Sequence, residues 1–274
     1  MTVSLAIYTT LDISNVSYLN SSIKWFAIKA SIDTLRHIHE GIPGKFFTPD
    51  NNSFPEAILQ DWDKGGIVCE IPEIDGFLSL KWNYGNDKNT PYWPNCLIVD
   101  FDILPNNWSI SFSERFLMDG LEVLDGFFAA LLMPQIKPWG GGRWGLTAGL
   151  QQIPHLTVFG REYIALLGRS KIINAPVFSV TEKDQAIAIR LFNNLPTSES
   201  VEWKNKQNEL QAYFGRQFFG RAISPKPSRM FSVFDILNVS RMVAEFWVES
   251  RSPRNVLGGP VAVPMLDWNR MKSR

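Results

Sequence analysis

Alternation of apolar and polar residues between Ile67 and Ile103 is the feature that most constrains what this chain can fold into. The first run alternates between Leu78, Leu80, Trp82 and Tyr84 on one side and Ser79, Lys81 and Asn83 on the other. After the turn-rich segment 86–94, a second run alternates between Leu97, Val99 and Phe101 and Ile98, Asp100 and Asp102. A period of two is typical of a strand with one buried and one wetter face, so we expect an antiparallel pair of strands here.

The segments before and after this unit are predicted to contain a strand, a loop and two helices. A strand is predicted at 3–9, and a helix is predicted from about residue 20 to Gly41, which places His37 and His39 in its last turn. Turn-forming residues predict a loop between Pro43 and Pro55. Apolar steps of three and four residues predict a second, longer helix over 113–133.

The second half repeats this mixture of elements. A short helix is predicted over 161–167, followed by a hairpin of strands 176–180 and 186–191, and then by helices over 202–219 and 231–247. The expected fold class is α+β, with antiparallel sheet elements packed against long amphipathic helices and a more helical C-terminal part. We expect a single globular domain over 1–274, or two subdomains joined at about 134–146, where glycine and proline are frequent.

Composition favours a globular, cytoplasmic protein. Hydrophobic residues make up 45% of the 274 residues and the net charge is zero, although residues 1–130 hold 17 acidic and 8 basic residues. The N-terminus does not have the pattern of a signal peptide, and no apolar stretch is long enough to span a membrane. The two cysteines, Cys69 and Cys96, form no CxxC motif and fit a reducing compartment.

Catalytic motifs are missing from the sequence. Three histidines occur, and neither the pair His37 and His39 nor His155 has carboxylates or thiols at a metal-binding spacing. The glycines at 140–142 follow a predicted helix, whereas a phosphate-binding loop follows a strand. We therefore expect no enzyme, no cofactor and no metal, and the scattered basic residues do not indicate direct binding to nucleic acid.

Acidic residues concentrate between Asp50 and Asp75, with Lys64 as the one basic residue among them. This segment is either a solvated loop and edge strand or a surface that attracts a basic partner protein. In the second interpretation Trp62 is a buried anchor in the complex, and the carboxylates speed the encounter. The predicted partner-binding residues are Asp61, Trp62, Asp63, Glu70, Glu73 and Asp75.

A family resemblance rests on residues 159–176. The chain contains Phe159-Gly160-Arg161-Glu162-Tyr163, then Leu167-Gly168-Arg169, Ile172 or Ile173, and Ala175-Pro176, followed by the predicted hairpin. This order resembles the bacterial immunity protein 52 family and its type VI secretion relatives, and the likeness extends over roughly 60–195. The resemblance implies a cytoplasmic antitoxin that neutralises a cognate toxin, often one that is restriction-endonuclease-like. It implies structural roles for Gly160, Tyr163, Gly168 and Pro176, and no catalytic residues.

Two other functions remain open at this point. Asp100 and Asp102 share one side of a strand, where two carboxylates could hold a divalent cation in an enzyme or a ligand-binding protein. Alternatively, the chain could be an adaptor that loads an effector onto the secretion machinery. The preferred hypothesis is an immunity protein that occludes a functional surface of a toxin, and the sequence does not indicate whether it self-associates.

Overall fold

The computed structural model describes residues 3–9, 16–39, 42–49, 56–63, 65–81, 95–101, 108–133, 150, 152–194, 200–215 and 219. The strands in this part of the chain are β1 (Val3–Thr9), β2 (Leu35–His39), β3 (Ile42–Phe47), β4 (Gly66–Ile71), β5 (Gly76–Lys81), β6 (Asn95–Phe101), β7 (Gly126–Leu132), β8 (Leu156–Phe159), β9 (Ser179–Lys183) and β10 (Ala186–Arg190). The helices are α1 (Val16–Ala30), α2 (Glu56–Asp63), α3 (Ile110–Val123), α4 (Arg161–Leu167), α5 (Arg169–Ile173) and α6 (Val201–Phe214), with a 3-10 turn, η1, at Pro72–Ile74.

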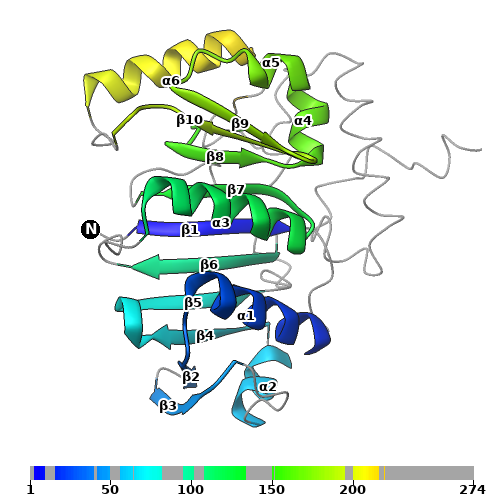
Figure 1. Cartoon of the computed structure of the whole chain (residues 1–274), viewed down its shortest axis with the longest axis vertical. Helices are drawn as coiled ribbons and strands as arrows, with labels where there is room; N and C mark the ends of the chain where they lie inside the picture. The colour runs from blue at the N-terminus through cyan, green and yellow to red at the C-terminus, as the bar shows by residue number, and fades with distance from the viewer. Residues whose placement is uncertain are drawn as a thin grey trace, which may run out of the picture.

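The described strands form a single sheet in the order β3-β2-β4-β5-β6-β1-β7-β8-β10-β9 (Figure 1). Every pairing between these strands is antiparallel, which confirms the predicted α+β class. The first strand in the sequence, β1, lies between β6 and β7, so a segment from the N-terminus joins strands that lie about 90 to 130 residues later in the chain.

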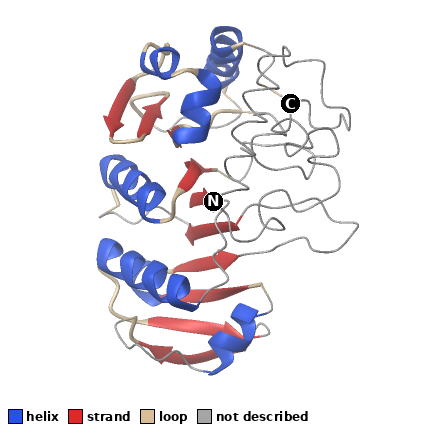
Figure 2. Cartoon of the chain, turned by 90° about the vertical axis from the view of Figure 1, so that its right-hand side faces the viewer, coloured by secondary structure: helices blue, strands red, loops and turns tan. Residues whose placement is uncertain are grey.

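Helices cover both faces of the sheet, and β7, β8 and β10 are packed against α3 and α4 alike. Figure 2 shows α1 and α3 along the same side of the strands. They pack in one core cluster with Leu5, Leu78 and Val99. Helices α4, α5 and α6 pack in a second cluster, with Tyr8 and Phe128 on the opposite face. Successive residues of a strand point to opposite faces, so the two clusters divide the side chains of β1 between them.

Capping and turn residues determine where several helices and strands end. Ser109 accepts a hydrogen bond from the backbone N–H of Phe112 at 3.1 Å, and Ser200 accepts one from Trp203 at the same distance, so each serine is the N-cap of its helix. Asp184 has a left-handed backbone (φ 51°) in the tight turn of the β9–β10 hairpin. The β5–β6 pair and the short helix α4 are confirmed, and so is the hairpin, although its first strand, β9, begins at Ser179 and not at Pro176 as predicted.

The predicted helix over 113–133 is wrong in its second half. Helix α3 ends at Val123, Asp125 takes a left-handed backbone conformation (φ 43°), and the chain returns as strand β7. Nearly all of β7 is buried, because neighbouring strands flank it and both of its faces are covered. A strand buried on both faces has no alternation, and its apolar run therefore resembles the continuation of a helix.

The predicted helix from 20 to 41 also ends early, and the predicted loop at 43–55 contains a strand. Helix α1 stops at Ala30, and Ser31 (φ 55°) reverses the chain into β2, which carries His37 and His39. Strand β3 then pairs with β2 as the edge of the sheet. Apolar residues three apart, at Ile32, Leu35 and Ile38, fit helix and loop–strand alike, so spacing could not separate the two.

The residues that carry the family resemblance have packing roles. A Cβ on Gly160 would lie 2.4 Å from the Gly126 carbonyl oxygen and 2.9 Å from the Phe127 Cα. Tyr163 is buried against the rings of Phe127, Phe128 and Phe159. Gly168 (φ 91°) ends α4 and begins α5. These positions therefore fix how α4 meets β7 and β8.

Two predicted segments fall outside the described residues: the connection at 134–146 and the helix at 231–247. The division into two subdomains stays a prediction. None of the helices that the structure describes is long and apolar enough to cross a membrane.

His155 is a buried polar residue that lies beside the second core cluster, against Phe192. Its ring is fully buried and stacks on Phe192, with ring centroids 6.1 Å apart and an angle of 3°. Neither ring nitrogen has a hydrogen-bond partner among the described residues. Burial, with a smaller effect of the Arg190 charge, lowers the pKa of His155 from 6.5 to about 4. The imidazole is therefore neutral in the folded protein at neutral pH.

Substitution of Gly160 tests the packing of α4. Gly160→Ala should lower the free energy of unfolding by about 1–3 kcal/mol, because the added methyl meets backbone atoms that cannot rotate away. The backbone of Gly160 (φ −82°) suits alanine, so the cost is purely steric. Gly168→Ala is the comparison: its Cβ would be 3.8 Å from the nearest heavy atom, and any loss there reflects backbone strain. Urea unfolding measures both, and a Gly160→Ala protein as stable as wild type would contradict the packing.

The buried His155 predicts an acid-sensitive stability. Because the folded pKa lies below the unfolded value, the unfolded chain takes up the proton more readily, and stability that is complete above about pH 6.5 is lost as the pH falls toward about 4. Between pH 7.5 and 4.5, wild type should lose about 2–3 kcal/mol more than His155→Leu. Urea unfolding across this range measures the difference. Parallel curves for the two proteins would contradict it.

Candidate functional site

The predicted acidic surface lies on α2, β4 and the turn that follows β4. Asp61 on α2 faces the histidines of β2: its Oδ2 atom is 3.0 Å from Nδ1 of His39. The same oxygen is 3.1 Å from Nε2 of His37, close enough for an ion pair although without the alignment of a hydrogen bond. Burial lowers the pKa of His37, while Asp61 opposes that shift. Asp61 therefore holds α2 against β2.

The carboxylates of β4 and the following turn differ in how they are held. Glu70 accepts a hydrogen bond from Nε of Arg36 on β2 at 2.7 Å. Glu73 accepts hydrogen bonds from the backbone N–H of Thr34 at 3.1 Å and from its hydroxyl at 3.2 Å, while Glu73 itself is exposed. Asp75 is exposed, with a left-handed backbone (φ 48°), and its carboxylate has no recorded partner among the described residues.

Trp62 does not add to this surface. Trp62 is 0% exposed and belongs to the core between α2 and the sheet, together with Ile58 one helical turn earlier. That i, i+4 spacing is the sequence signal of an inward-facing pair on α2. The side chain of Asp63 lies outside the described residues. The surface therefore needs a different aromatic anchor.

Two exposed aromatic residues lie in line with the acidic residues across the sheet. The strand registers place Phe46, Arg36, Glu70, Phe77 and Asp100 directly opposite one another on β3, β2, β4, β5 and β6, and we call this set the outer row. Phe46 is 56% exposed and Phe77 is 43% exposed. The residues beside them along the strands, such as Leu78 and Val99, are buried under α1 and α3. The outer row therefore faces away from these helices.

Charges surround the rings of the outer row. The guanidinium of Arg36 lies over the Phe46 ring, 5.2 Å from its centroid, and also bonds Glu70. At the other end of the row, Asp100 accepts a hydrogen bond from the hydroxyl of Ser4 on β1. Counting Glu73 and Asp75 in the adjoining turn, four carboxylates and one guanidinium lie on or beside the row. The surface is thus acidic, with an aromatic ring on each side of an ion pair.

Sequence reasoning missed Phe46 and Phe77, although one of them left a signal. Phe77 precedes Leu78 and therefore falls on the wetter side of the β5 alternation, together with Ser79 and Lys81. A large apolar side chain on that side is exposed to solvent, which is unusual for a phenylalanine. Phe46 gives no such signal, because the turn-forming residues between Pro43 and Pro55 predict a loop there.

Of the alternative site at Asp100 and Asp102, the structure describes only Asp100. Asp102 lies outside the described residues. Within the described ranges, no group of three or more His, Cys, Asp or Glu side chains is arranged to hold a metal ion. Both cysteines are buried and burial raises the pKa of each to about 12, so neither thiol is a ready thiolate.

Comparisons with known proteins give a limited result. No family model matches the chain, and no curated protein matches its sequence. Among solved structures, the fold is similar to the Pseudomonas aeruginosa T6SS protein PA0821, with 11% sequence identity and a TM-score of 0.41. That match covers 76% of this chain and 75% of the other. A likeness of this extent carries no argument about function, and membership of the immunity protein 52 family stays a prediction.

The two kinds of carboxylate should respond differently to neutralisation. Asp61→Asn should lower the free energy of unfolding by about 1–3 kcal/mol, because it weakens the contacts of a half-buried charge with two histidines. Asp75→Asn is the matched control and should change stability by less than about 0.5 kcal/mol, since its side chain is exposed. Urea unfolding at pH 7.5 measures both. Equal effects of the two substitutions would show that Asp61 does not hold α2.

Proposed function

We propose that this chain is an immunity protein that binds a cognate secreted toxin through the outer row and occludes a functional surface of that toxin. The observation that carries the proposal is the outer row itself: two exposed aromatic rings on an acidic stretch of sheet. The family resemblance of residues 159–176 supports the same function. Action in the cytoplasm, without enzymatic activity, belongs to the proposal.

Phe46 and Phe77 are suited to anchor a protein partner. Large apolar side chains that become buried at the centre of an interface contribute most of its binding energy, while surrounding polar residues exclude water. Arg36 and Glu70 lie between the two rings and bond each other, so they need no new partner when water is excluded. The row thus offers apolar area with its central charges already paired.

The acidic surroundings favour a basic partner. Asp75 and Asp100 carry negative charge beside Phe77, and complementary charge mainly raises the rate of association. A nuclease has a basic face because its substrate channel must attract phosphates. A nuclease toxin of a type VI secretion system is therefore the partner we favour, in agreement with the family resemblance. Because the whole chain has zero net charge, local occlusion explains inhibition better than mimicry of DNA.

Co-expression provides the direct test of this function. The protein encoded by the gene adjacent to this one is produced in a sensitive host, with and without this chain. An immunity protein should restore growth and co-purify with its toxin. Co-purification without restored growth would instead identify an effector-loading adaptor, and failure of both would contradict the proposal.

Substitutions in the outer row test where the partner binds. Phe77→Ala should weaken toxin binding by about tenfold or more, because it removes an aromatic anchor. The matched control is Ile28→Ala: Ile28 is 71% exposed on α1, on the other side of the sheet, and its loss should leave affinity unchanged. Surface plasmon resonance with immobilised toxin measures both. Equal affinities for the two variants would exclude Phe77 from the interface.

Charge reversal tests the electrostatic part of the proposal. The double variant Glu73→Lys, Asp75→Lys should lower the association rate constant, and the reduction should be larger at 20 mM than at 300 mM salt, because salt screens exposed charges. The dissociation rate constant should change less. An association rate that does not depend on these charges at either salt concentration would contradict a basic partner face.

A further inference from the structure

Strand β9 is the last strand in the order of the described sheet, and among the described strands it bonds to β10 alone. Its residues Thr181, Glu182 and Lys183 are exposed. The edge of a sheet carries backbone N–H and C=O groups without a partner in the sheet, and a further strand can bond to them. The opposite edge strand, β3, contains Pro43, which has no N–H to offer. Strand β9 contains no proline, so its edge is the better suited to extension.

Two residues of β9 direct their backbone groups to the open edge. In an antiparallel pair, residues that exchange both backbone hydrogen bonds alternate with residues that exchange none. A two-residue turn separates Lys183 from Ala186, so these two residues are the hydrogen-bonded pair that closes the hairpin. Val180 and Glu182 therefore belong to the alternate set, and their N–H and C=O groups point away from β10.

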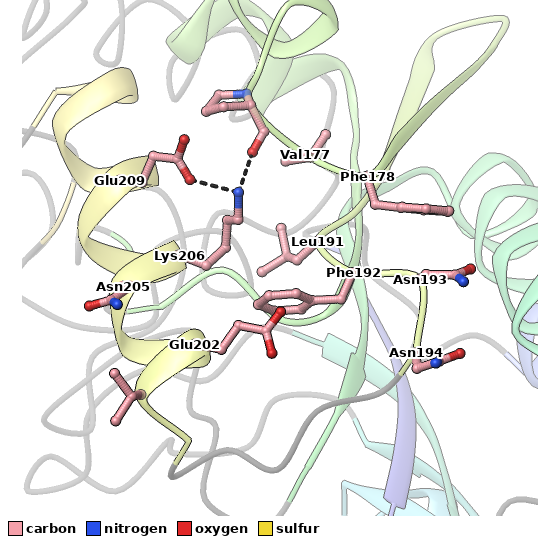
Figure 3. Close-up of a pocket in the computed structure, with 12 residues that line it drawn as sticks. Val177, Phe178, Leu191, Phe192, Asn193, Asn194, Glu202, Asn205, Lys206 and Glu209 are labelled. Atoms are coloured by element: carbon pink, nitrogen blue, oxygen red, sulfur yellow. Dashed lines mark hydrogen bonds and ion pairs between the residues drawn. The ribbon is translucent and has the colours of Figure 1, made fainter.

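The start of β9 is held in place by its neighbours. The backbone N–H of Phe178 donates a hydrogen bond to the carbonyl oxygen of Arg190 at 2.9 Å, so bonding to β10 continues one residue before the strand. Earlier still, the Pro176 carbonyl oxygen accepts a hydrogen bond from the Lys206 ammonium of α6 at 2.9 Å (Figure 3). The same ammonium bonds the Glu209 carboxylate at 2.6 Å. The strand is thus ordered before it gains a partner, which lowers the entropic cost of pairing.

The charged side chains of β9 are already compensated. Charges on an edge strand usually oppose pairing between proteins. Glu182, however, accepts a hydrogen bond from the guanidinium of Arg169 on α5. Lys183 donates hydrogen bonds to two carboxylates of α3, that of Asp119 at 2.7 Å and that of Glu122 at 3.4 Å. Adjacent side chains of a strand lie on opposite faces of the sheet, so neither of these two lies across the edge itself.

We propose that β9 pairs antiparallel with β9 of a second copy of this chain, across a two-fold axis at Thr181. Val180 then lies opposite Glu182 of the other copy, and the two exchange both backbone hydrogen bonds through their outward groups. The two Thr181 side chains face each other, which is a favourable cross-strand pair. A contact between strands this short gives a reversible dimer. The inference does not depend on the proposed function, because the outer row lies towards the opposite edge of the sheet.

The neighbouring registers are disfavoured by the same residues. An axis at Val180 would place Glu182 opposite Phe178, whose N–H already bonds the Arg190 carbonyl oxygen. An axis at Glu182 would place two carboxylates directly opposite each other, which is destabilising. The axis at Thr181 brings the outward groups together and sets no like charges of β9 opposite each other.

Sedimentation equilibrium of the full chain tests the dimer. The average mass of wild type should rise with protein concentration towards that of a dimer. Thr181→Lys should weaken dimerisation by roughly tenfold or more, because two ammonium groups would face each other at the axis. Thr181→Val is the matched control and should dimerise like wild type. Thermal unfolding shows whether each variant is folded. A wild type that stays monomeric, or a folded Thr181→Lys that dimerises as strongly as wild type, would overturn the proposal.

Cysteine cross-linking tests the register. In a non-hydrogen-bonded pair the two Cα atoms are about 4.5 Å apart, a separation that a disulfide spans. Thr181→Cys should therefore form a covalent dimer under mild oxidation. Ser179→Cys should not, because in this register its two copies lie about 14 Å apart. The native Cys69 and Cys96 are buried and should not interfere. Equal cross-linking of Ser179→Cys and Thr181→Cys would overturn the register.

Binding of the proposed toxin separates a second copy from a different partner strand. If β9 pairs with a second copy, Thr181→Lys should bind the toxin as wild type does, since the outer row is unchanged. A wild type that stays monomeric, together with toxin binding that Thr181→Lys abolishes, would show that β9 receives a strand of the toxin. That result would overturn the assignment of a second copy.

Discussion

The pairing of β1 on both of its edges is the constraint on which the rest of the structure depends. Residues Val3–Thr9 bond to β6 on one side and to β7 on the other, so β1 joins the strands on its two sides into one hydrogen-bonded sheet. Its side chains are divided between two cores: Leu5 and Ile7 face α1 and α3, whereas Ala6 and Tyr8 face the opposite way. A one-residue shift of register would exchange the two sets, so both cores fix the pairing.

This division explains where a binding surface can exist. Helices α1 and α3 cover one face over β4, β5, β6 and β1, so apolar residues such as Leu78 and Val99 on that face are buried. The alternate residues of the same strands point the other way, and Phe77 is exposed among them. Because Arg36 and Glu70 satisfy each other in the middle of this face, the outer row can remain in water when free and lose water when bound. Among the described residues, helices cover only one side of β4, β5 and β6, and Phe77 is exposed on the other side.

The sequence predicts a strand correctly where one face of the strand is exposed to solvent, and wrongly where both faces are buried. Alternation around Leu78 and Val99 predicted β5 and β6 with the correct sides. Strand β7 carries no alternation, because both of its sides are buried, so its apolar run predicts a helix. The same limitation affected the site: Glu70, Glu73 and Asp75 were predicted as a surface, but the inward position of Trp62 required knowledge of how α2 packs. The alignment of Phe46 with Phe77 depends on pairing between distant strands, which no local pattern records.

The central claim is that a partner covers the outer row. Hydroxyl-radical footprinting of the protein, alone and in complex with the proposed toxin, tests it most directly, since side-chain oxidation follows solvent exposure. The account predicts that oxidation of Phe46 and Phe77 falls in the complex, while oxidation of the exposed Ile28 on α1 is unchanged. Protection of Ile28 with continued oxidation of both phenylalanines would place the partner on the helical side of the sheet and contradict the account.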